Sequence, residues 1–324
     1  MILLTIGAAW GGTMWVHMLD VGQGDSILIE TPAGDAILID AGPASGQVSS
    51  QLAKLGVEDL DLVVATHPHA DHIGGMRSVI VKYPVGLYLD SGMEHTTRTY
   101  QALDGALDQY EVAHRAARYG ESFHFDDDIL VTVLWPGTSR LRHTRSDLNS
   151  NSVVVRVDHG EDCFLFTGDA EQPTERALLS AGLESCEVLK VAHHGSNHST
   201  TDSFVRAVEP EIAIVSNGSN NYGHPGDEVL ERLEHHGVVI YRTDDSGHIA
   251  LASSGQGIEV VDGIPWSSDR PRPGSPGDLP GNGNNPVTVA HAGTGEAPDL
   301  SGVRDKPPAI EEPTPRKGCL FRRP

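Results

Sequence analysis

A cluster of histidines and one aspartate, placed directly after an apolar segment, constrains this 324-residue chain more than any other feature. The apolar run Leu60 to Ala65 predicts a buried strand, and His67-Pro68-His69-Ala70-Asp71-His72 follows it. Two glycines, Gly74 and Gly75, then allow a tight turn into a helical pattern. A loop at the end of a strand holds side chains on a rigid scaffold and leaves one side open. The segment therefore predicts a ligand-binding loop.

The four polar side chains of this loop have the spacing of a metal site. His67 and His69 are separated by one residue, so in extended backbone their side chains point to the same side and can bind one ion. Asp71 and His72 lie one turn further on and can grip a second ion nearby. A single surface histidine is usually only solvated, but three histidines and an aspartate within six residues predict metal binding. Imidazole and carboxylate suit zinc, manganese or iron, so ligand type does not fix the metal.

Further polar residues follow predicted strands in the second half of the chain. Gly168-Asp169 and His193-His194 each come directly after an apolar run, and His224 lies in a later polar loop. Strands alternate with helices, yet a hairpin opens each half, which predicts two mixed sheets with helices on the outer faces. The polar loops can then share one edge of an α/β sandwich, where ligand sites gather.

Composition divides the chain into three parts. Residues 1–13 form a short apolar extension, residues 14–263 carry the strand and helix pattern, and residues 264–324 are rich in Pro and Gly. The last part buries too little surface to offset its ordering entropy, so we expect a disordered tail, whose partner is unknown. No run is long enough for a transmembrane helix, and we expect a soluble, cytoplasmic protein.

The three cysteines show no paired spacing. Cys163 and Cys186 lie in apolar runs and are interpreted as small core residues. Neither a disulfide framework nor a cysteine zinc finger is predicted.

Together, these motifs resemble one known family. His67 to His72 match the HxHxDH signature of the metallo-β-lactamase superfamily. Residues 19–26, 166–169, 191–196 and 222–225 are similar to the C-terminal hydrolase domain of ComEC competence proteins. The resemblance covers about residues 14–261 and implies a four-layer αββα sandwich with a two-metal site. The membrane channel region of ComEC is absent here, so we expect a stand-alone relative, to which a role in DNA uptake does not carry over.

The resemblance also implies the metal ligands. The expected ligands are His67, His69, Asp71, His72, Asp169 and His194. His67 and His69 would hold the first ion, and Asp169 would bridge both ions.

The resemblance further implies catalytic roles for three residues. Asp71 could orient the nucleophile, His193 could be a ligand or a proton donor, and His224 could ligate metal or touch the leaving group. For both histidines the alternative is a hydrogen-bonding role, such as capping a helix. Asp20 and Asp25 could orient ligand histidines or only make loop hydrogen bonds.

One position departs from the superfamily pattern. A third histidine for the first ion is expected just before the strand that starts at Ser152, where this chain has Asp147 to Asn151. His143 could substitute from the same loop. The expected cofactor is therefore one or two ions of Zn²⁺ or Mn²⁺.

These features favour a metal-dependent phosphodiesterase, including a nuclease on single-stranded DNA, with a metal-bound hydroxide as nucleophile. A net charge of −22 and the lack of a basic stripe weaken the nuclease version. Metal ions, however, supply the local positive charge that a phosphate needs. Two alternatives stay open. One is a hydrolase of a lactone, thioester, phosphocholine or other small ester, and the other is a non-enzymatic metal-binding or scaffold protein.

Overall fold

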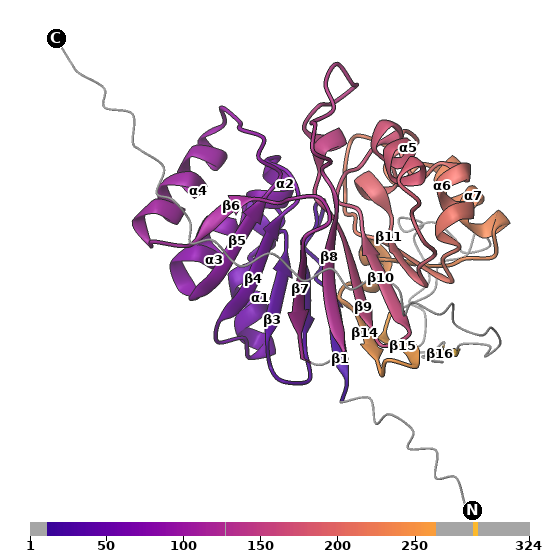
Figure 1. Ribbon diagram of the computed structural model, residues 1–324, viewed down its shortest axis with the longest axis horizontal. Coiled ribbons are helices and arrows are strands. Elements are labelled where there is room, and N and C mark those ends of the chain that lie inside the picture. Colours follow the sequence, from indigo (N-terminus) through magenta and orange to yellow (C-terminus); the bar gives the residue numbers. More distant parts are fainter. Residues whose placement is uncertain (1–11, 127, 264–287, 291–324) are drawn as a thin grey trace, which may run out of the picture. The chain divides into compact units, whose positions relative to one another are not determined.

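The computed structural model describes residues 12–126, 128–263 and 288–290. Within them, two β-sheets pack face to face and helices cover their outer faces (Figure 1). The predicted four-layer α/β sandwich is confirmed.

In the described part of the chain, the first sheet has the strand order β16-β15-β14-β1-β2-β3-β4-β5-β6. Its strands are β1 Met14–Met18, β2 Ile27–Glu30, β3 Ala36–Ile39, β4 Leu60–Ala65, β5 Val85–Asp90, β6 His114–Ala116, β14 Ile249–Ser253, β15 Gly257–Asp262 and β16 Thr288–Ala290. Pairing is antiparallel from β16 to β3 and parallel from β3 to β6.

The second sheet has the order β13-β12-β11-β10-β9-β8-β7. Its strands are β7 Ser122–Phe125, β8 Ile129–Trp135, β9 Val154–His159, β10 Asp162–Phe166, β11 Val188–Lys190, β12 Ile212–Val215 and β13 Val239–Arg242. Pairing is antiparallel from β7 to β10 and parallel from β10 to β13, so both sheets are mixed, as the hairpins at the start of each half predicted.

Helices cover the outer face of each sheet (Figure 1). The first sheet is covered by α1 Val48–Leu55, α3 Met76–Lys82 and α4 Arg98–Gln109, and the second by α5 Gln172–Ser180, α6 Asp202–Val208 and α7 Asp227–His235. The short elements are α2 Ala70–Ile73, α8 Thr243–Ser246, η1 Ala44–Gly46, η2 Asn149–Asn151 and η3 Ala192–Gly195.

The main core lies between the two sheets. Ile29 and Val64 of the first sheet and Val155 and Phe164 of the second belong to one buried cluster. Each such side chain contributes about 1.5–3 kcal/mol on burial. The alternate residues of the same strands pack against the helices, as Leu38 does, which explains why central strands read as continuous apolar runs. This rigid double layer fixes the strand ends that carry the polar loops.

The structure corrects the interpretation of two cysteines. Cys163 and Cys186 are buried, as predicted, but they form a disulfide with a Cα–Cα distance of 5.0 Å. Their sequence separation of 23 residues carries no pairing signal. The two cysteines meet because β10 and β11 are parallel neighbours, with Phe164 opposite Val188.

Some predictions fall largely outside the described residues. The apolar extension is described only from residue 12, and of the predicted disordered tail only Thr288–Ala290 is described, as β16 paired with β15. Among the residues that the structure describes, none belongs to a helix with the length and apolar character that a bilayer crossing requires.

Candidate metal centre

Strand ends from both sheets bring all six predicted metal ligands to one place. His67 and His69 follow β4, and Asp71 and His72 lie on α2. Asp169 follows β10 and His194 lies in η3, after β11. The carboxyl ends of neighbouring parallel strands meet at one edge of each sheet, and face-to-face packing of the two sheets brings these edges together.

The first group consists of His67, His69 and Asp169, whose candidate ligand atoms lie within 4.8 Å of one another. His67 Nε2 lies 2.9 Å from His69 Nδ1 and 3.7 Å from Asp169 Oδ2. His69 has extended backbone, with φ −75° and ψ 150°, which turns both imidazoles to the same side as predicted. The group can hold one ion.

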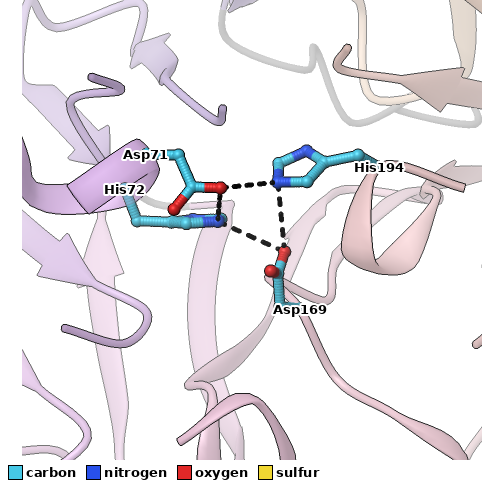
Figure 2. A group of neighbouring side chains, drawn as sticks. All are labelled: Asp71, His72, Asp169 and His194. Carbon is cyan, nitrogen blue, oxygen red and sulfur yellow. Dashed lines mark ion pairs between the residues drawn. The ribbon is translucent and has the colours of Figure 1, made fainter. Parts of the chain in front are cut away.

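The second group consists of Asp71, His72, Asp169 and His194 (Figure 2). His72 Nε2 and His194 Nε2 lie 3.2 and 3.6 Å from Asp169 Oδ1. Asp71 Oδ2 lies 3.4 Å from His194 Nε2 and 3.9 Å from His72 Nε2. Two imidazoles and two carboxylates around one point are a donor set that suits zinc or manganese.

Three buried atoms in the second group make no hydrogen bond that meets ordinary geometry within the described residues, although they lie at ion-pair distance from one another. These atoms are His72 Nε2, Asp169 Oδ1 and His194 Nε2. Burial of unpaired polar atoms is costly, and native proteins normally satisfy them. A divalent cation would satisfy all three, so the residues present fit a metal ion.

In His72 and His194, the ring nitrogen that faces away from the centre makes a hydrogen bond, which orients the imidazole. His72 Nδ1 lies 2.7 Å from Asp40 Oδ2, and Asp40 accepts hydrogen bonds from Thr66 N and Oγ1 at 2.7 and 2.6 Å. His194 Nδ1 donates to the Ser216 carbonyl at 2.8 Å, so its Nε2 faces the centre. Such partners fix the tautomer and direction of metal ligands.

A buried ion pair lies behind the second group. The Lys190 ammonium contacts the Asp25 carboxylate and donates to the Gly168 carbonyl at 2.9 Å. Asp25 Oδ1 lies 3.4 Å from His194 Nδ1, and its Oδ2 lies 3.8 Å from His72 Nδ1. Burial raises the pKa of Asp25, but Lys190 and His194 outweigh it and the net shift is downward.

Left-handed backbone positions the candidate ligands of the second sheet. Gly168 has φ 50°, and a Cβ there would lie 2.8 Å from Thr66 Cβ and 3.1 Å from Ser152 Cβ. His193 and His194 also have positive φ, at 51° and 53°. Left-handed backbone is costly for residues other than glycine and clusters at functional sites.

The charges of the centre balance one another in the metal-free protein. Burial lowers the pKa of His194, but Asp169 and Asp25 outweigh it and raise the value to about 9. Burial raises the pKa of Asp169, but His72 and His194 bring it well below its usual range. The pKa of His67 is lowered by burial and by the charge of His72. A divalent cation can therefore replace protons at this centre.

A cavity of about 590 Å³ opens above the centre, and the other two predicted histidines line it. His193 Nε2 lies 3.6 Å from Asp169 Oδ2, and its ring centroid lies 5.3 Å from that of His224. Burial and the charges of His193 and His194 lower the pKa of His224 to about 4. Asn149 Nδ2 lies 3.3 Å from His193 Nε2 at the same cavity.

The structure also places three residues whose roles were left open, His143, Asp20 and Asp25. His143 is exposed, and its backbone N donates to Asp147 Oδ2 at 3.2 Å, so this loop does not bring its imidazole into either metal group. Asp20 accepts from Gly22 N at 3.0 Å within its own loop, whereas Asp25 lies beside the ligand histidines.

Comparisons with known proteins show which proteins this chain resembles. The profile described as Metallo-beta-lactamase superfamily matches residues 19–218. ComE operon protein 3 of Bacillus subtilis is 29% identical over 271 residues, which is 77% of this chain and 34% of that protein. ComE operon protein 3, Competence protein ComA and Recombination protein 2 confirm the resemblance to competence proteins of the ComEC type. The chain spans about a third of the length of these relatives.

A shorter relative and a solved structure also match. Exodeoxyribonuclease WalJ of Streptococcus pneumoniae is 34% identical over 211 residues, covering 57% of this chain and 73% of that protein. Igni18, a metallo hydrolase of Ignicoccus hospitalis, superposes with a TM-score of 0.50 at 16% identity, covering 73% of this chain and 98% of that one. At 16% identity, the match to this solved structure shows similarity of fold alone.

Proposed function

This chain belongs to the metallo-beta-lactamase superfamily and is a metallo-hydrolase, and from that premise we propose that it hydrolyses phosphodiester bonds of nucleic acid. The observation that carries the proposal is the position of Asp169. Its Oδ2 faces the first group and its Oδ1 faces the second, so one carboxylate can bridge two ions. A bridged pair of ions suits in-line displacement at phosphorus.

The proposed ligands divide between the two ions. The first ion would take His67, His69 and Asp169, and the second Asp71, His72, Asp169 and His194. Bound Zn²⁺ or Mn²⁺ supplies Lewis acidity and lowers the pKa of bound water. Asn149, in the loop where a third histidine was expected, lines the cavity and offers an amide rather than an imidazole.

Asp71 is the residue we assign to the attacking water. Its side chain is 35% exposed and lines the cavity, while its Oδ2 lies 3.4 Å from His194 Nε2. Burial opposes ionisation, but the charge of His72 and the hydrogen bond from His194 lower the pKa of Asp71 strongly. The ionised carboxylate can accept a hydrogen bond from water and hold it for attack.

His193 and His224 are the residues we assign to the leaving group. Both line the cavity beside the centre, with ring centroids 5.3 Å apart. His193 Nδ1 lies 3.5 Å from Glu171 Oε1, a carboxylate that can orient the ring. His193 would donate a proton to the leaving oxygen, and the neutral His224 would donate one N–H hydrogen bond to it.

Nucleic acid is the substrate class that the relatives support. The relative from Streptococcus pneumoniae is named an exodeoxyribonuclease, and the match spans 73% of its length. A chain of net charge −22 repels a polyanion at long range, so the bound ions would provide the local attraction.

A substrate panel tests the proposal. Protein loaded with Zn²⁺ or Mn²⁺ is assayed on bis(p-nitrophenyl) phosphate, a single-stranded oligonucleotide, a lactone and a thioester. We expect turnover of the two phosphodiesters and a loss of roughly 100-fold or more in kcat for Asp71→Asn. Asp20→Asn is the matched control, because this carboxylate accepts a hydrogen bond from Gly22 N and does not line the cavity. Faster turnover of the lactone or thioester would support the small-ester alternative instead.

A further inference from the structure

An exposed aromatic side chain lies at the mouth of the catalytic cavity. Tyr222 is 76% exposed, the most exposed large apolar or aromatic side chain among the described residues. It lines the cavity above the metal centre, and its ring centroid lies 5.9 Å from that of His224. An exposed ring next to a polar, metal-binding centre offers a flat apolar face within reach of the reacting bond.

The loop that carries Tyr222 is fixed by a single asparagine. Asn220 Oδ1 accepts hydrogen bonds from Tyr222 N and His224 N at 3.0 and 3.1 Å. Its Nδ2 donates to the Gly218 and His224 carbonyls at 2.8 and 2.7 Å. The ring therefore stands on a preorganised loop, and less entropy is lost when a ligand packs against it.

A single cationic side chain lines the same cavity. Arg145 is the one Lys or Arg among the cavity-lining residues, and its side chain is 57% exposed. Its Nη1 lies 3.2 Å from Oε1 of Glu171, a buried carboxylate. This ion pair engages one terminal nitrogen of the guanidinium, and the remaining N–H donors of the half-exposed side chain can bind a phosphate.

We propose that Tyr222 and Arg145 form a nucleotide subsite beside the scissile bond, which makes single-stranded nucleic acid the preferred substrate; this rests on the proposed phosphodiesterase function. A base of the strand stacks on the Tyr222 ring, and the neighbouring phosphate pairs with Arg145. Every base has a π-face, so stacking is tolerant of sequence and contributes substantially per base.

The charge of the protein explains the preference for a single strand. Duplex binding relies on several Lys and Arg contacts to phosphates, and this cavity offers one arginine. Stacking must supply much of the remaining affinity. The bases of a duplex are stacked on each other, whereas those of a single strand are free to stack on an aromatic ring.

Binding and turnover are measured separately to test the subsite. Fluorescence anisotropy gives the Kd of metal-loaded protein for a phosphorothioate oligothymidine of about ten nucleotides, within the usual site size. We expect Tyr222→Ala to weaken binding about ten-fold, since one stacked base contributes roughly 1.4 kcal/mol or more. Tyr222→Phe keeps the ring and should bind like the wild type. Tyr119→Ala is the matched control, because Tyr119 is 49% exposed but lines a different cavity.

Substrates without bases complete the test. An abasic oligomer should bind the wild type as weakly as oligothymidine binds Tyr222→Ala, and Arg145→Ala should reduce the dependence of Kd on salt. Equal affinity of the wild type and Tyr222→Ala, or of abasic and normal oligomers, would overturn the subsite even if phosphodiesters are hydrolysed. Tyr222-dependent binding without hydrolysis of any phosphodiester would leave the subsite standing and contradict the proposed function.

Discussion

The Lys190 ammonium contacts the Asp25 carboxylate at the back of the centre, where both side chains are buried. The same ammonium donates to the Gly168 carbonyl, and Asp25 lies 3.4 Å from His194 Nδ1. The Lys190 ammonium thus supports the loop before Asp169 and compensates the charge of the carboxylate behind His194, a candidate ligand. Removal of one partner of a buried ion pair leaves an uncompensated charge, which is strongly destabilising.

Lys190→Met should therefore lower the free energy of unfolding by about 3–5 kcal/mol. Urea denaturation of the metal-free protein measures it. Lys54→Met, at an exposed position of α1, is the matched control and should change stability by no more than about 0.5 kcal/mol. The double variant Asp25→Asn/Lys190→Met should recover part of the loss, because no buried charge is then left alone. Equal stability of Lys190→Met and the wild type would show that the pair is not needed.

Gly168→Ala should disturb the position of Asp169. The added Cβ would lie 2.8 Å from Thr66 Cβ, at a residue whose φ is 50°. Gly182→Ala is the matched control, because Gly182 has φ 83° but nothing lies within 4 Å of the added atom. Both variants carry backbone strain, and only Gly168→Ala adds the clash, so its metal affinity should fall further. Equal metal affinities by isothermal titration calorimetry would mean that Gly168 does not position the bridging carboxylate.

The disulfide between Cys163 and Cys186 should contribute about 2–4 kcal/mol to stability. Iodoacetamide followed by mass spectrometry should label both cysteines only after reduction of the denatured chain. The double variant Cys163→Ser/Cys186→Ser should have a lower Tm than the wild type. Disulfides persist mainly in oxidising compartments, so labelling in intact cells also tests the predicted cytoplasmic localisation. Labelling of both residues without reductant would contradict the disulfide.

The stability of the metal-free protein should fall as pH rises from about 6.5 to 9. The folded protein raises the pKa of His194 from 6.5 to about 9, so this stabilisation is complete below pH 6.5 and is lost as pH passes 9. His72 shifts in the same direction, whereas the lowered pKa of His67 affects stability only below 6.5. Urea titrations in EDTA at several pH values measure the slope, which His194→Gln should reduce. Stability that rises over this interval would contradict the assigned charges.

Metal binding should show the opposite dependence on pH. A divalent ion displaces the proton of His194, so its affinity should increase as pH rises toward 9. Calorimetry in two buffers of different ionisation enthalpy counts the protons released. No proton release at pH 7 would contradict a protonated His194 in the metal-free centre.

Hydrophobic periodicity was sufficient to predict most of the fold. The strand predicted over Leu60 to Ala65 is β4 with the same bounds, and hairpins open both halves. β6 and β7 were not predicted, because His114–Ala116 is only three residues long and Ser122–Phe125 is largely exposed or half-buried. Strands this short carry too little periodicity, and their pairing depends on neighbours distant in sequence.

The grouping of the candidate ligands was predictable where they cluster in sequence or follow a strand. The structure brings His67, Asp169 and His194 together as the motifs indicated. Asp40 and Lys190 were not predicted as part of the site, because their roles depend on which strands are neighbours. An acidic residue at the end of β3 and a lone lysine in the apolar strand β11 were the available signals. Nothing in the sequence around Tyr222 indicates that its side chain is exposed at the cavity.

Metal content of the wild type and of Asp169→Asn tests the central claim most directly. Protein purified without chelator is analysed by inductively coupled plasma mass spectrometry, with bis(p-nitrophenyl) phosphate hydrolysis measured on the same samples. We predict about two ions per chain in the wild type, as in two-metal hydrolases. Asp169→Asn should lose at least one ion together with the activity, and Asp20→Asn should keep both. An Asp169→Asn protein that retains two ions and full activity would contradict a bridging carboxylate.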